Sequence, residues 1–106
     1  MAAMNINARQ YEELILSNVP VLVDFWAPWC TYCRRIDPAL DKLADNRKDV
    51  LIVKVNVDEE PELARREQIE VIPTLVLYRG GEAIGSIVAP ESKAMIDAFI
   101  QEKLAK

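Results

Sequence analysis

The chain has 106 residues, of which 51% are hydrophobic and 28% are charged, and this length and composition predict one globular domain spanning residues 1–106. The formal net charge of −4 argues against binding to nucleic acid, and no apolar run reaches the ~18 residues that a membrane-spanning helix needs. The chain has two cysteines and no histidine, which excludes imidazole catalysis, haem ligation by histidine and most zinc sites.

The first half of the chain alternates helical and extended patterns. Asn7, followed three residues later by Gln10, predicts the capped start of a helix. The β-branched and aromatic run at 19–26 predicts a strand. A longer helix is expected over 31–44, where Pro38 should introduce a kink.

The second half of the chain contains three more extended segments. The apolar run at 50–57 is typical of a strand buried on both faces of a sheet, and a short helix follows it. Two strands at 74–79 and 82–88 flank a pair of glycines, which predicts a hairpin. Ser92 can cap a last helix. The apolar stripe expected on that helix consists of Met95, Ile96, Phe99, Ile100 and Leu104.

This order of elements predicts the α/β class, with a central mixed sheet. Alternating strands and helices give parallel strands joined by right-handed crossovers, and the late hairpin adds antiparallel strands. We therefore expect helices on both faces of the sheet.

The two cysteines, Cys30 and Cys33, lie between the first long strand and the long helix that follows it. A cysteine at a helix N-terminus is favoured as a thiolate, because unpaired N–H groups and the helix dipole stabilise negative charge there. The second cysteine lies one helical turn further on, within reach of the first sulfur. This position favours a redox-active pair.

Three other interpretations of the cysteine pair remain open. A structural disulfide over so short a loop would constrain the unfolded chain by only about 2 kcal/mol. Zinc or an iron–sulfur cluster needs four ligands, so a second chain would have to complete the site. The two thiols could also be buried without any chemical role.

Two charged residues interrupt otherwise apolar strands. Asp24 shares one face of its strand with Leu22 and Trp26, and a buried carboxylate usually has a raised pKa. Such an acid near Cys33 could accept its proton. Lys54 could pair with Asp24 if their strands are neighbours. The alternatives are an exposed edge position for Asp24 and a surface lysine whose ammonium reaches water.

The segments Asp24 to Arg34 and Ile72-Pro73-Thr74 together resemble the thioredoxin family. The resemblance covers essentially the whole chain and includes Pro38, Lys54 and Gly81. It implies a thioredoxin fold and thiol–disulfide exchange, with Cys30 as the exposed nucleophile and Cys33 as the buried resolving thiol. Asp24 and Lys54 would assist proton transfer. The family's substrate groove implies a cis Pro73 beside the sulfurs and contacts from Trp29, Thr31, Tyr32, Ile72, Thr74 and Val88.

The chain departs from the family pattern at two places. Thr31-Tyr32 stands between the cysteines where thioredoxins usually carry Gly-Pro, and this pair helps to set the reduction potential. Val88 falls where the family usually has a glycine after the last strand. A branched side chain there would narrow the substrate groove.

The resemblance predicts a cytoplasmic protein-disulfide reductase that acts as a monomer. Residues 1–5 show no features of a secretion signal, which agrees with a compartment where thiols are kept reduced. The expected partners are a thioredoxin-reductase-type electron donor and disulfide-bearing client proteins, without nucleic acid or membrane. No bound cofactor is expected, because the Cys30–Cys33 dithiol carries the two electrons. An oxidase or isomerase and a non-catalytic binding module are the alternatives.

Overall fold

The computed structural model describes residues 3–105, so residues 1, 2 and 106 of the predicted domain lie outside the described residues. Five strands form one sheet in the order β1-β3-β2-β4-β5. The three strands β1, β3 and β2 are parallel, whereas β4 is antiparallel to both β2 and β5. The elements are β1 Met4–Asn5, α1 Ala8–Ile15, β2 Val21–Trp26, α2 Thr31–Asn46, β3 Leu51–Asn56, α3 Pro61–Arg66, β4 Thr74–Arg79, β5 Glu82–Val88 and α4 Lys93–Leu104.

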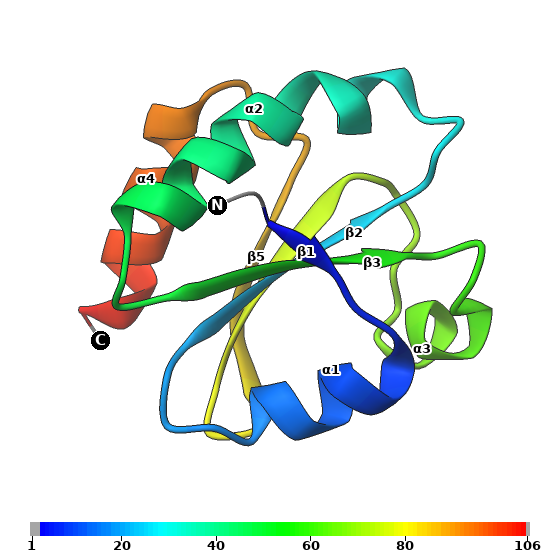
Figure 1. The fold of residues 1–106 in the computed structure, drawn as a ribbon, viewed down its shortest axis with the longest axis horizontal. Coiled ribbons are helices and arrows are strands. Elements are labelled where there is room, and N and C mark those ends of the chain that lie inside the picture. Colours follow the sequence, from blue (N-terminus) through cyan, green and yellow to red (C-terminus); the bar gives the residue numbers. More distant parts are fainter. Residues whose placement is uncertain (1–2, 106) are drawn as a thin grey trace.

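Helices cover both faces of this sheet, as the sequence predicts. Helices α2 and α4 lie on one face, and α1 and α3 lie on the other (Figure 1). Strand β2 lies in the middle of the sheet, with β3 and β4 as its neighbours. The carboxyl end of β2 therefore leads from the centre of the sheet directly into α2.

The predicted alternation along β2 separates two hydrophobic cores. Val21, Val23 and Phe25 pack into the core on the α1 and α3 side of the sheet. Leu22 packs into the opposite core, together with apolar residues of α2 and α4. Asp24 faces the same side as Leu22, since alternate residues of a strand share a face. This places the Asp24 carboxyl beneath α2.

Hydrogen bonds confirm the predicted starts of two helices, and backbone φ angles confirm the predicted hairpin turn. Asn7 and Gln10 form a reciprocal capping box at the start of α1. Ser92 Oγ accepts the Met95 N–H at the start of α4. Gly80 and Gly81 have φ angles of 62° and 86°, the positive pair that a type I′ hairpin turn requires.

Two features differ from the sequence-based expectation. Strand β1 was not predicted, because two residues are too few to show an alternating pattern; it exists by pairing with Val53 and Lys54 of β3. Met95 was expected on the buried stripe of α4 but is exposed, because it lies in the first turn of the helix, at the edge of the stripe formed by Ile96, Phe99 and Ile100. Within residues 3–105, no helix is both long enough and apolar enough to cross a membrane.

Candidate active site

Cys30 is the N-cap residue of α2 and forms a disulfide with Cys33. The Cys33 backbone N–H donates to Cys30 Sγ at 3.1 Å, so an unpaired donor of the first helical turn points at this sulfur. The predicted position of Cys30 at a helix N-terminus is confirmed. The same N–H would stabilise a thiolate on Cys30 after reduction.

The two sulfur-bearing residues differ in accessibility. Cys33 is fully buried, whereas Cys30 retains 8% of its surface. The prediction of an exposed Cys30 was too strong, because this residue packs against Ala27 and Cys33 in a small cluster. Cys30 is nevertheless the more accessible of the two cysteines, which fits the predicted order of attack.

The segment before β4 lies directly beside Cys30. The Ile72–Pro73 peptide bond is cis, as the family resemblance implies. The Ile72 carbonyl oxygen lies 4.0 Å from Cys30 Sγ. The Thr74 hydroxyl donates to the Val71 carbonyl, so this side chain stabilises the turn itself. The structure therefore brings Cys30 together with the predicted Ile72-Pro73-Thr74 segment.

Exposed side chains border the cysteines. Trp29 is 68% exposed, and its Nε1 donates to Asp58 Oδ2 at 3.0 Å. Thr31 is exposed on the first turn of α2. The Tyr32 hydroxyl donates to the Pro90 carbonyl at 3.0 Å and so connects α2 to the segment after β5. Sequence reasoning missed Asp58, whose contact with Trp29 depends on the loop after β3.

The family's glycine was expected at the position of Val88. The backbone conformation that favours glycine after β5 occurs instead at Ala89. Ala89 has a φ of 45°, in the left-handed region that favours glycine. Its N–H donates to the Pro73 carbonyl at 2.9 Å, which holds this turn against the cis-proline segment. Val88 is the last residue of β5, where it pairs with Thr74 of β4, and it is 51% exposed. Its side chain therefore lies on the surface beside the strand residue that follows Pro73, and its backbone does not occupy the left-handed position.

Asp24 is fully buried in the central strand, so the exposed-edge alternative is wrong. Neither of its carboxyl oxygens has a hydrogen-bond partner among residues 3–105. Burial raises the pKa of Asp24 from 3.8 to about 7; Lys54 opposes this rise and Asp37 adds to it. A carboxyl group with a pKa near neutrality can both accept and release a proton under physiological conditions.

Lys54 is buried beside Asp24, but the expected ion pair between them is not formed. The two residues are neighbours in the register of β2 and β3. Lys54 Nζ instead donates to Asp37 Oδ1 of α2 at 2.7 Å and lies 4.4 Å from the centroid of the Trp26 ring. Asp37 pairs with Lys54 in place of Asp24, because its carboxylate reaches the Lys54 ammonium group from α2, which covers this face of the sheet. The surface-lysine alternative is also wrong, since Lys54 is only 8% exposed.

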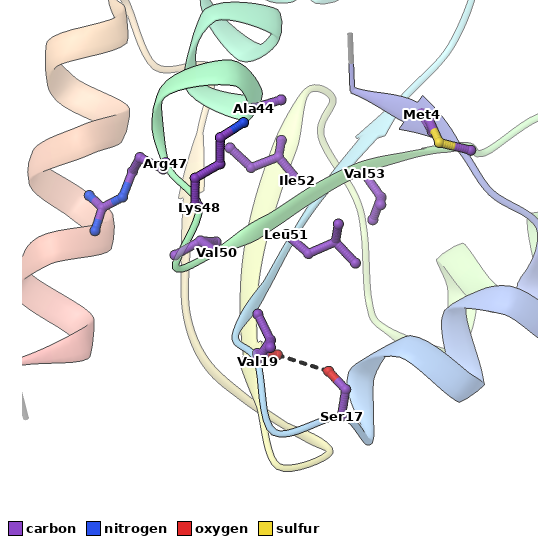
Figure 2. Close-up of a pocket in the computed structure, with 10 residues that line it drawn as sticks. All are labelled: Met4, Ser17, Val19, Ala44, Arg47, Lys48, Val50, Leu51, Ile52 and Val53. Carbon is purple, nitrogen blue, oxygen red and sulfur yellow. Dashed lines mark hydrogen bonds between the residues drawn. The ribbon is translucent and has the colours of Figure 1, made fainter. Parts of the chain in front are cut away.

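A separate groove of about 410 Å³ lies at the other end of β3 (Figure 2). It is lined mostly by apolar side chains, among them Met4, Val19 and Leu51, and by the exposed Lys48. None of the site residues predicted from the sequence lines it. No cluster of three or more metal-ligating side chains occurs within residues 3–105.

The fold and the cysteine pair together define the class of protein. A Cys-x-x-Cys disulfide at the N-terminus of a helix, following a central strand that carries a buried carboxyl, is the arrangement of a thiol–disulfide oxidoreductase. The chain is a protein-disulfide oxidoreductase of this class.

Comparison with known proteins identifies the family. The Thioredoxin family model matches residues 2–102, so the chain belongs to the thioredoxin family and has the thioredoxin fold. Thioredoxin 1 of Synechococcus elongatus is 40% identical over 105 residues, which cover 98% of each chain. The bifunctional thioredoxin reductase/thioredoxin of Mycobacterium leprae is 40% identical over 91 residues, covering 85% of this chain and 20% of that protein. Oxidized mitochondrial thioredoxin 3 of Saccharomyces cerevisiae superimposes with a TM-score of 0.84 at 32% identity, covering 94% of each chain.

Proposed function

We propose that this oxidoreductase works as a cytoplasmic, monomeric protein-disulfide reductase with Cys30 as its nucleophile. The observation that carries the proposal is the position of Cys30: its sulfur accepts the Cys33 N–H at the start of α2, and Cys30 is the more exposed of the two cysteines. The thioredoxin relatives support the reducing direction. A relative in which thioredoxin reductase and thioredoxin share one chain supports a reductase-type electron donor.

The reaction begins with the reduced dithiol. The Cys30 thiolate attacks one sulfur of a client disulfide, forms a mixed disulfide, and releases the other client sulfur as a thiolate. Cys33 then loses its proton and attacks Cys30 Sγ, which releases the second client thiolate and leaves the Cys30–Cys33 disulfide. Both electrons pass from the dithiol to the client, so the protein needs no bound cofactor for this exchange.

Asp24 is the proposed acceptor of the Cys33 proton. It lies on the face of the sheet that α2 covers, and its pKa of about 7 lets the carboxylate and the protonated form coexist at neutral pH. Asp24→Asn removes the acceptor and should slow disulfide reduction near neutral pH. An unchanged rate over the whole pH range would remove Asp24 from the mechanism.

The proposed client groove surrounds Cys30. Trp29 and Val88 offer exposed apolar surface, and the backbone at Ile72 lies within 4.0 Å of the Cys30 sulfur. An extended client segment bound along this backbone would present its disulfide to Cys30. The proposed substrate-binding residues are Trp29, Thr31, Tyr32, Ile72, Pro73, Thr74 and Val88.

The order of attack can be tested by trapping mixed disulfides. Cys33→Ser should accumulate a covalent adduct with a client such as insulin, because Cys30 attacks but nothing resolves the bond. Cys30→Ser should accumulate none and serves as the matched control. Equal adduct formation by the two variants would contradict the assigned roles.

An oxidase or isomerase is the second candidate, and the observation that favours it is Thr31-Tyr32 between the cysteines. These residues occupy the first turn of α2, where changes alter the stability of the Cys30 thiolate and therefore the reduction potential. Equilibration of the Cys30–Cys33 pair with a glutathione buffer measures that potential. A value well above about −220 mV, the upper end of the cytosolic range, would favour the oxidase.

A further inference from the structure

The ammonium group of Lys54 has two partners that are not Asp24. It donates to Asp37 Oδ1 at 2.7 Å, and it lies 4.4 Å from the centroid of the Trp26 ring. Trp26 is itself fixed, because its Nε1 donates to Asn5 Oδ1 of β1 at 2.8 Å. The cation that neighbours Asp24 in the sheet is therefore held between an indole ring and a carboxylate of α2.

Asp37 lies where its carboxylate can hold the Lys54 ammonium group. It lies on α2 one turn after Cys33, directly over the face of the sheet that carries Asp24 and Lys54. The Asp37 side chain is 30% exposed and that of Lys54 only 10%, so Asp37 brings a partly solvated charge to a buried one. Such charge-assisted hydrogen bonds are strong and directional, which fixes where the ammonium group lies.

We propose that Asp37 is a positioning residue of the exchange site: its carboxylate holds the Lys54 ammonium against Trp26 and so prevents a direct ion pair between Lys54 and the buried Asp24 carboxyl. This inference rests on the proposed role of Asp24 as proton acceptor. This role requires no contact of the Asp37 carboxylate with the cysteine sulfurs or with the client. Its effect on the reaction passes through Lys54.

The charges around Asp24 explain why this positioning matters. Lys54 from β3 and Asp37 from α2 are the charged groups that act on it, whereas its partner on β4 is the apolar Leu75. Burial and Asp37 raise the pKa of Asp24, and Lys54 lowers it. A Lys54 ammonium released from Asp37 could approach Asp24 and stabilise the carboxylate, which would make Asp24 a weaker base.

The test is a pH titration of the Asp24 carboxyl carbon by NMR in the oxidised protein. In Asp37→Ala, we expect the pKa of Asp24 to fall by about one pH unit or more, which is about tenfold in the ratio of protonated to ionised form. Asp41→Asn is the matched control: it removes a carboxylate one turn further along α2 but retains an acceptor for the Ala3 N–H. The control should leave the pKa of Asp24 close to that of the parent protein.

A double-mutant cycle distinguishes two ways in which Asp37 can change the pKa of Asp24: by holding Lys54, or by the direct electrostatic effect of its own charge. Lys54→Met removes the ammonium group and keeps a side chain of similar length. If Asp37 acts by holding Lys54, Asp37→Ala should shift the Asp24 titration much less in the Lys54→Met protein than in the parent. Equal shifts in the two backgrounds, or no shift in Asp37→Ala, would overturn the proposal.

Failure of this inference can be distinguished from failure of the proposed function. The titration reads the protonation of Asp24 without any turnover. An unchanged rate in Asp24→Asn would overturn the base role of Asp24, while the NMR cycle would still decide whether Asp37 positions Lys54. If both hold, the pH midpoint of disulfide reduction in Asp37→Ala should move to lower pH together with the Asp24 titration.

Discussion

Replacing Asp24 with Asn is expected to abolish a pH-dependent loss of stability. Burial raises the pKa of Asp24 to about 7, so the folded protein keeps a proton that the unfolded chain releases at about pH 4. The stability that depends on this proton is complete below about pH 4 and is lost as the pH rises to about 7. The two pKa values differ by about three pH units, each worth about 1.4 kcal/mol, so about 4 kcal/mol is lost over this range.

Urea unfolding of the oxidised parent protein and Asp24→Asn between about pH 4 and about pH 8 measures this difference. The two proteins should be similar in stability at the acidic end, where both side chains are neutral, and this end is the internal control. At the basic end the variant should be more stable by several kcal/mol. Parallel curves across the whole range would show that folding does not raise the pKa of Asp24 and would refute the reasoning.

Three further substitutions test local features by the same urea unfolding. Asn7→Ala removes the acceptor of the Gln10 N–H at the start of α1 and should cost about 1 kcal/mol; no loss would mean that the cap does not stabilise the fold. Tyr78→Phe removes the 2.6 Å hydrogen bond to Glu67 and should cost about 1–2 kcal/mol, whereas a more stable variant would contradict a favourable bond. Gln68 has a φ of 58° after α3, so Gln68→Gly should add about 0.5–1 kcal/mol; a destabilised variant would show that the left-handed backbone is not strained.

The fold could be predicted from the sequence where local signals agree with the tertiary structure. The capping pair Asn7 and Gln10, the two glycines of the hairpin, and the alternation along β2 each act over a few residues, so the sequence shows them directly. Strand β1 could not be predicted in this way. Two residues become a strand only because β3 offers a parallel edge, and this is a long-range condition.

The candidate site shows the same division between local and long-range information. Cys30 at the start of α2 follows from its place between a strand and a helix, and a buried Asp24 follows from its apolar neighbours. The partner of Lys54 depends on the height and rotation of α2 above the sheet. Since these are set by packing, the sequence predicted a pair with Asp24 where the structure has one with Asp37.

The absence of an ion pair at Asp24 bears both on the stability of the fold and on the chemistry of the site. A fold under selection for stability alone would place an apolar residue at this buried position or give the carboxyl a partner, because the ionised form costs several kcal/mol at neutral pH. The chain has no histidine, so no imidazole is present to exchange protons near pH 7. Burial raises the pKa of the Asp24 carboxyl into that same range, because Lys54 opposes the rise only in part and Asp37 adds to it. The burial that destabilises the ionised folded state therefore also gives Asp24 the pKa that its proposed role as acceptor of the Cys33 proton requires.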